Sequence, residues 1–147
     1  MDCIFNKQIP ESTEKIVIIR PSSKTFITGL ASSYDETYPK ILQSRVSVEE
    51  WSAALAKINE ALFYYWPCFM CMSFGYCFSP CTLGLSFCLP GMRINEAKQK
   101  VIQEMNSINK DFSRKGMKLK LVQKCSTSWI EVELEEILAM DTDNSQL

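Results

Sequence analysis

The stretch ALFYYWPCFMCMSFGYCFSPCTLGLSFCLPGM, residues 61–92, decides what kind of fold this chain can adopt. It runs for 32 residues between Glu60 and Arg93 without one charged side chain. Aromatic and aliphatic residues fill most of it, and so much apolar surface needs either a protein core or a bilayer to bury it. Which of the two buries residues 61–92 is the main question that the sequence raises.

Prolines and glycines divide this apolar segment into short pieces. A transmembrane helix needs about 20 apolar residues in continuous helix. Only 12 residues separate Pro67 from Pro80, and only nine separate Pro80 from Pro90. Because proline ends or kinks a helix, we expect a helical hairpin that dips into one leaflet of a membrane and returns to the same side. A kinked span and a buried core of a soluble protein are the two alternatives.

The rest of the composition fits one small domain without a strong charge. The chain has 147 residues, a length at which a single domain can bury a real core. Sixteen basic and 17 acidic residues give a net charge of −1, so no global field attracts nucleic acid or an anionic membrane. The first residues lack the features of a secretory signal, so we expect the chain to face the cytosol, where thiols stay reduced.

Four segments rich in β-branched or alternating residues predict strands. Lys15–Arg20 and Lys24–Leu30 are separated by a short turn sequence and predict a first hairpin. Lys118–Lys124 and Trp129–Ile137 predict a second hairpin. The last of these segments alternates aliphatic residues with glutamates, which is typical of a strand with one buried face.

Two amphipathic segments flank the apolar stretch and predict helices. Ser47 and Glu50 fit a capping box at the start of the first. Its apolar positions recur at three- and four-residue spacing and form one stripe: Trp51, Ala54, Leu55, Ile58, Ala61, Leu62 and Tyr65. We expect Pro67 to end this helix. A second helix is expected from near Arg93 to near Gly116, with the stripe Ile94, Ala97, Val101, Met105, Ile108 and Phe112.

These segments predict an α+β fold. Two β-hairpins form an antiparallel sheet, two amphipathic helices cover one face of it, and the cysteine-rich apolar hairpin lies between the helices. We expect residues 1–14 to form a mobile tail and residues 15–138 to form the single domain, with 61–92 as its insertion. The acidic and polar residues 139–147 are expected to be disordered.

Five of the seven cysteines lie in the apolar segment, at Cys68, Cys71, Cys77, Cys81 and Cys88. The first pair has zinc-ligand spacing, but the chain has no histidine and bulky apolar residues fill the gaps. A redox pair is disfavoured because Cys68 follows a helix rather than a strand. Any single cysteine can be a small buried hydrophobe. Beside an amphipathic helix at a membrane surface, however, such a group is typical of reversible S-palmitoylation.

More than one lipid signal is expected to anchor the chain. Each buried methylene contributes about 0.8 kcal/mol, and stable anchoring generally takes two signals. Two acyl chains, or one acyl chain with the dipping hairpin, satisfy this requirement. We therefore expect covalent palmitate and neither a metal nor another cofactor. Aromatic side chains of the segment are expected to contact the membrane or a partner: Trp66, Phe69, Phe74, Phe78 and Phe87.

Catalytic constellations are missing from the sequence. Without histidine there is no Ser-His or Cys-His pair, and no glycine-rich phosphate loop is present. The adjacent glutamates at 49–50 and 135–136 are interpreted as a helix start and a solvated strand face. We therefore expect no enzymatic activity, no small-molecule substrate and no nucleic-acid partner.

Several local motifs occur together in one order along the chain. They are a strand ending at Arg20, a strand over 26–30, a loop with Tyr34, Tyr38 and Pro39, and a helix with Trp51, Leu55, Ile58 and Asn59. The most specific are Cys68-Phe-Met-Cys71 and Cys81-Thr-Leu-Gly84. From about Ile16 to Leu134 the chain thereby resembles the cysteine-rich hydrophobic domain proteins and the related golgin-subfamily and yeast Ras-acylation accessory subunits.

This resemblance implies a non-catalytic accessory subunit that binds and stabilises a DHHC-type protein S-acyltransferase, which palmitoylates Ras-like or other substrates. It also implies that the subunit is itself palmitoylated, with the acylated pair at Cys68 and Cys71 and further candidates at Cys77, Cys81 and Cys88. The alternative is a palmitoylated peripheral adaptor in vesicle trafficking without an acyltransferase partner. Either function places the chain on the cytoplasmic face of the Golgi, endoplasmic reticulum, vesicle or plasma membrane.

Overall fold

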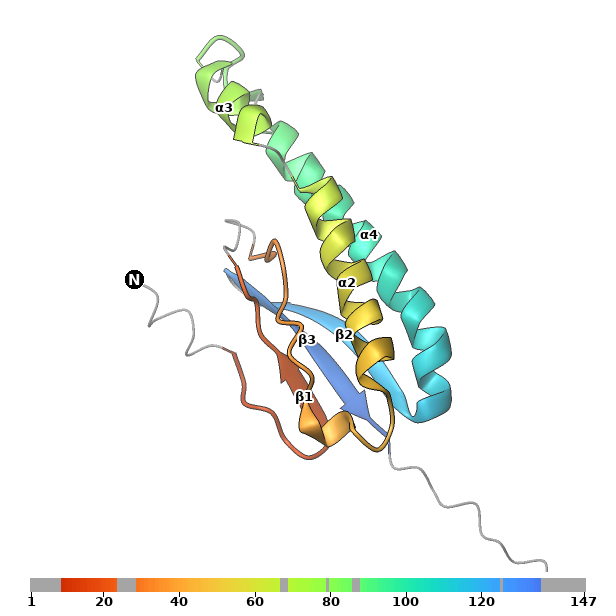
Figure 1. Cartoon of the computed structure of the whole chain (residues 1–147). Coiled ribbons are helices and arrows are strands. Elements are labelled where there is room, and N and C mark those ends of the chain that lie inside the picture. The colour runs from red at the N-terminus through yellow and green to blue at the C-terminus, as the bar shows by residue number, and fades with distance from the viewer. Residues whose placement is uncertain are drawn as a thin grey trace, which may run out of the picture.

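A computed structural model describes residues 9–23, 29–66, 69–78, 80–85, 88–124 and 126–135. The chain folds as one α+β unit, in which a helix pair covers one face of an antiparallel sheet (Figure 1). In chain order, its elements are β1 (Ile16–Ile19), the 3₁₀ turn η2 (Lys40–Leu42), α2 (Val48–Tyr65), α3 (Phe69–Phe78), α4 (Cys88–Phe112), the 3₁₀ turn η4 (Ser113–Lys115), β2 (Met117–Lys124) and β3 (Thr127–Leu134). The α+β class expected from the sequence is confirmed.

The described sheet has three strands in the order β1-β3-β2. The second expected hairpin is confirmed, since β2 and β3 pair along their full length, with Leu119 opposite Val132. The first is not seen: β1 pairs with β3, with Val17 opposite Val132. Of the expected partner strand Lys24–Leu30, residues 24–28 lie outside the described part, and Gly29 and Leu30 are not in a strand.

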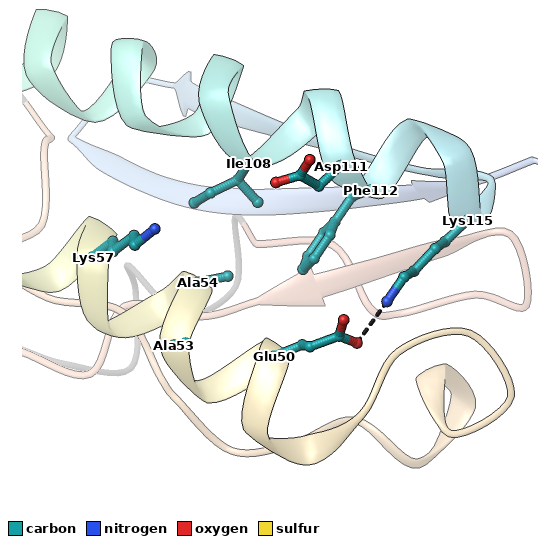
Figure 2. Close-up of a pocket in the computed structure, with 8 residues that line it drawn as sticks. All are labelled: Glu50, Ala53, Ala54, Lys57, Ile108, Asp111, Phe112 and Lys115. Atoms are coloured by element: carbon teal, nitrogen blue, oxygen red, sulfur yellow. Dashed lines mark hydrogen bonds and ion pairs between the residues drawn. The ribbon is translucent and has the colours of Figure 1, made fainter.

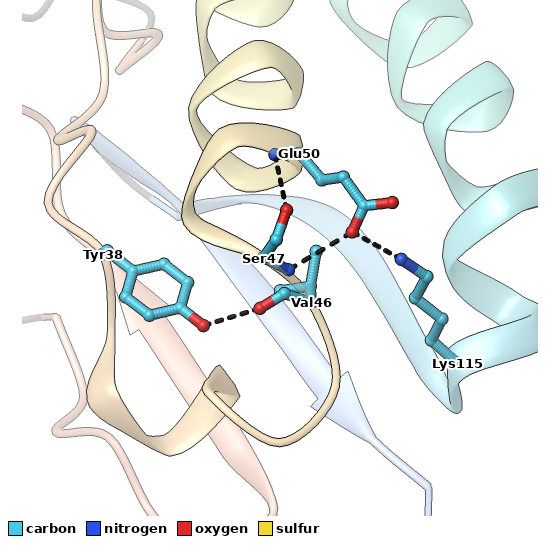
Figure 3. A network of polar contacts seen from close by, with 5 residues as sticks. All are labelled: Tyr38, Val46, Ser47, Glu50 and Lys115. Carbon is cyan, nitrogen blue, oxygen red and sulfur yellow. Dashed lines mark hydrogen bonds and ion pairs between the residues drawn. The ribbon is translucent and has the colours of Figure 1, made fainter.

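The first helix, α2, begins and ends where its sequence predicts. Ser47 accepts a hydrogen bond from the Glu50 amide, and the Glu50 carboxylate accepts one from the Ser47 amide, which completes the capping box (Figure 3). The same carboxylate lies 2.6 Å from Nζ of Lys115, so α2 starts against the end of η4. The helix ends at Tyr65, and Trp66 has the extended backbone that a residue before proline prefers.

The second long helix, α4, begins five residues earlier than the sequence predicts. It starts at Cys88 rather than near Arg93, so Pro90 and Gly91 lie in its first turn. Proline is tolerated there because the first amides of a helix have no partner within the helix. The helix ends at Phe112, and Gly116, with φ of 66°, reverses the chain into β2 after the η4 turn. Glycine suits this left-handed conformation, because it has no Cβ to clash.

The hydrophobic core lies between the helix pair and the inner face of the sheet. Every residue of the stripe expected on α4 is buried, and so are Trp51, Ala54, Leu55, Ile58 and Leu62 of the α2 stripe. On the sheet side, the core is closed by Val17, Ile19, Met117, Leu119, Ile130 and Val132. Figure 2 shows α2 and α4 side by side, with Ala54 on α2 facing Ile108 and Phe112 on α4.

Two asparagines, one on each long helix, hold backbone groups of other elements. Asn59 of α2 accepts from the Tyr34 amide and donates to the Tyr34 carbonyl, at 2.9 and 3.0 Å. Asn109 of α4 does the same for Leu119 of β2, at 2.7 and 2.9 Å. Because β2 is at the edge of the described sheet, Asn109 satisfies groups that would otherwise offer an unpaired strand edge.

Candidate membrane-binding tip

The helix pair projects beyond the sheet and carries the apolar segment at its far end (Figure 1). There α3 packs against the start of α4, and a turn over residues 80–85 connects the two helices. We refer to residues 69–92 as the tip. The tip lies at the opposite end of the helix pair from the start of β2 (Figure 1), and none of its described residues belongs to the hydrophobic core cluster.

The tip presents large apolar side chains to solvent. On α3, Met70, Phe74, Tyr76 and Phe78 are half-exposed, and the rings of Phe74 and Phe78 stack at 5.7 Å. Other large apolar side chains exposed in the described part of the chain around the tip are Phe63 and Tyr64 at the end of α2, Leu83 and Leu85 in the turn, and Met92 on α4. Exposed apolar side chains gathered at one end of a fold are typical of a binding surface.

The turn at the end of the tip is built by local hydrogen bonds and two left-handed residues. The amides of Cys81 and Thr82 both donate to the Phe78 carbonyl, at 3.1 Å, which ties the turn to the end of α3. Leu83 and Gly84 then have φ of 51° and 87° and reverse the chain. Leu83 is 96% exposed. A leucine in this conformation costs stability and gains no packing within the chain.

Charged residues border the tip without entering it. On α4 the first is Arg93, which pairs with Glu96 at 3.3 Å while both remain about half-exposed. Further along, the ammonium group of Lys100 lies 5.6 Å from the ring centroid of Tyr65 on α2, in a cation–π contact. An apolar end bordered by aromatic rings and basic side chains is typical of a protein surface that meets a lipid headgroup layer.

The structure describes only part of the predicted acylation set. Cys77 and Cys81 are free and exposed at the tip. Cys71 lies on α3 and Cys88 begins α4, but their side chains fall outside the described part, as does all of Cys68. A thiol must be reachable to be acylated, and Cys77 and Cys81 meet this requirement.

The five expected contact aromatics have different positions. Phe74 and Phe78 are exposed on α3, whereas Trp66 at the end of α2 is half-buried and packs against the core. Phe69 begins α3 with its side chain undescribed, and Phe87 lies outside the described residues. Leu83 and Leu85 are also exposed in the turn, and nothing in the sequence distinguishes them from the other apolar residues of the segment.

Two of the alternatives for the apolar segment can be compared with the structure. No helix in the described ranges is both long and apolar enough to cross a membrane. A buried core is not seen for the large side chains that the structure describes here, because Met70, Phe74, Tyr76 and Phe78 on α3 and Leu83 and Leu85 in the turn are exposed. Among the described residues, no group of three or more candidate ligands could hold a metal ion.

The observations on the fold and the tip are not supported by likeness to a known protein. No model of a protein family matches the chain, and neither a search of curated proteins nor a search of solved structures gives a match.

Proposed function

We propose that the chain is a non-catalytic accessory protein that docks on a membrane through its tip and holds a partner enzyme there. The observation that carries the proposal is that α3 and the turn after it, whose described large apolar side chains are exposed, lie at the far end of the helix pair (Figure 1). An end of this kind gains free energy when a bilayer covers it, while the sheet and most of both helices stay in water.

The charges bordering the tip set the depth of docking. Only Cys88 to Met92 precede Arg93 on α4, which is about 7 Å of helix at 1.5 Å per residue. The Arg93–Glu96 pair would remain at the headgroup layer, since charged groups are costly in hydrocarbon. The tip would therefore enter one leaflet, whose core is about 15 Å thick, no deeper than Arg93 allows.

Acylation supplies the second signal in this proposal. Burying an exposed leucine or phenylalanine contributes about 1.5–3 kcal/mol at most, and part of the total is lost to immobilisation. The tip alone therefore binds reversibly. Palmitate on the exposed Cys77 and Cys81, together with Cys68, Cys71 and Cys88, would make the association durable, because two or more signals are needed for stable anchoring.

The partner is proposed from the resemblance of the sequence to acyltransferase accessory subunits. In this interpretation a DHHC-type protein S-acyltransferase binds the body of the chain near the membrane and is stabilised by it, while the chain supplies no catalytic group. Palmitoylation of Ras-like or other substrates would depend on the complex. The cytoplasmic face of the Golgi, endoplasmic reticulum, vesicle or plasma membrane is the proposed location.

Affinity purification of the tagged full-length chain in mild detergent, followed by mass spectrometry, tests the partner. Recovery of a near-stoichiometric DHHC-type acyltransferase supports an accessory subunit, provided that the cellular level of this enzyme falls when the chain is deleted. If the acyltransferases keep their level and Ras-like acylation is unchanged after deletion, the accessory role is wrong. Recovery of vesicle or coat components alone would instead support the palmitoylated trafficking adaptor.

A further inference from the structure

A second surface lies on the solvent side of the helix pair, between α2 and α4. Two neighbouring hollows, of about 270 and 380 Å³, share Lys57 in their lining. The first runs from Glu50 past Ala53 and Ala54 to Asp111, as Figure 2 shows, and the second continues past Ala61 to Tyr64. Small alanine side chains on α2 leave the space, and we refer to the two neighbouring hollows together as the groove, whose second part leads towards the tip.

The groove has an excess of negative charge. Four carboxylates line it, from Glu50, Glu60, Glu104 and Asp111, against the two ammonium groups of Lys57 and Lys115. Lys115 is engaged by Glu50 at 2.6 Å. Glu60, Glu104 and Asp111 still exceed Lys57 together with Lys100, whose ammonium group lies over the ring of Tyr65 in the lining. These carboxylates are spread along the groove rather than gathered around one point. They therefore favour an extended, positively charged ligand over a single ion.

The groove also has apolar and aromatic surface for the stems of basic side chains. The exposed ring of Tyr64 lies at one end, whereas Ile108 and Phe112 at the other end are buried in the core and form only its floor. Lysine and arginine bury their methylene groups against such surface and place their cationic heads beside carboxylates or aromatic faces. The contact between Lys100 and Tyr65 shows the same chemistry within the chain.

We propose that this groove binds a lysine- or arginine-rich segment of a partner protein held at the same membrane. From Glu50 to Tyr64 the groove follows α2 for about 21 Å at 1.5 Å per residue, which matches about four turns of a partner helix. Because one end lies beside the tip, a segment that emerges from the bilayer can enter it directly. The proposal concerns a different surface from the tip, and it rests on the proposed function only in placing the partner at the membrane.

Fluorescence anisotropy of labelled peptides with the purified full-length chain tests the groove, in a detergent that covers the tip. The probes are an alanine-based 18-residue peptide with five lysines and the same peptide with glutamates in their place. We expect the lysine peptide to bind about tenfold tighter at low salt, with the preference falling as salt rises. Equal affinities for the two peptides would overturn the proposal.

Charge-reversal variants place the binding on the groove. Glu60→Lys, Glu104→Lys and Asp111→Lys combined should abolish or invert the preference. The matched control combines Glu11→Lys, Glu14→Lys and Glu135→Lys, three exposed glutamates outside the groove with the same change of net charge. If the control set has the same effect, the attraction is not from the groove. A dimer in sedimentation that Ala53→Trp dissociates would assign the groove to a second copy and contradict the proposal.

Discussion

The hydroxyl oxygens of Tyr34 and Ser128 lie 2.7 Å apart inside the core, where the Ser128 hydroxyl also accepts a hydrogen bond from the Ala31 amide. Both side chains are almost completely buried. This contact joins the loop before η2 to the start of β3, ninety-four residues away in sequence. Replacement Tyr34→Phe should therefore lower the free energy of unfolding by about 1–2 kcal/mol, measured by urea denaturation.

The same variant should change how stability depends on alkaline pH. Burial is the main cause that raises the pKa of Tyr34 to about 12, partly opposed by its hydrogen bonds with Ser128 and Ala31. The unfolded chain ionises this phenol near pH 10, so the stability it supplies is complete below that pH and is lost as the pH rises towards 12. The Tyr34→Phe variant should therefore not show this loss of stability between pH 10 and 12. An unchanged slope between pH 10 and 12 would argue against a buried neutral phenol.

Asn109 should be among the least replaceable polar residues of α4. Its side chain satisfies both the amide and the carbonyl of Leu119. Asn109→Leu leaves both groups without these bonds, and we expect a loss of about 2–3 kcal/mol in unfolding free energy. Asn106→Leu is the matched control, because Asn106 is exposed on the same helix. Equal effects of the two substitutions would show that the hydrogen bonds between Asn109 and Leu119 contribute no stability.

Leu83 should show opposite effects on stability and on membrane binding. Its φ of 51° disfavours leucine, whereas asparagine tolerates this region, so Leu83→Asn should stabilise the chain by about 0.5–1 kcal/mol. The same change removes an apolar side chain from the turn over residues 80–85 and should weaken binding to vesicles. Leu85→Asn removes an equivalent exposed side chain at a residue without positive φ. It should weaken vesicle binding without the gain in stability, and stabilisation by both variants would exclude the backbone explanation.

Cys77 and Cys81 should carry acyl groups in cells. Both thiols are exposed, so the double replacement Cys77→Ser, Cys81→Ser should reduce metabolic labelling by an alkyne palmitate analogue and leave thermal stability nearly unchanged. Replacement of Cys3 and Cys125, which lie outside the apolar segment, is the control and should leave labelling intact. Labelling that is lost only with Cys3 or Cys125 would place the acylation away from the tip.

The helices and the second hairpin could be predicted because their signals are local. The stripe from Ile94 to Phe112 and the Ser47–Glu50 capping box are set by neighbours three or four residues apart, and both are confirmed. The pairing of β1 with β3 depends instead on contacts more than a hundred residues apart, which no local pattern specifies. The early start of α4 was missed because Pro90 breaks a helix interior but not a first turn.

The tip could be predicted in composition but not in geometry. An apolar segment looks the same in sequence whether a core or a surface receives it. Only the fold shows that Phe74 and Leu83 lie exposed at the far end of the helix pair, while Trp66 at its base packs on the core. The groove between α2 and α4 was missed for a related reason, because its alanines and carboxylates come from two helices that are distant in sequence.

Vesicle flotation of chain produced without acylation tests the central claim most directly, because only the tip can then hold it to the lipid. The unmodified protein should float with phosphatidylcholine vesicles. The variant Phe74→Ser, Phe78→Ser should stay in the dense fraction, whereas Ile41→Ser, Val48→Ser, which removes exposed apolar groups far from the tip, should float as before. Equal flotation of all three proteins, or of none, would contradict docking through the tip.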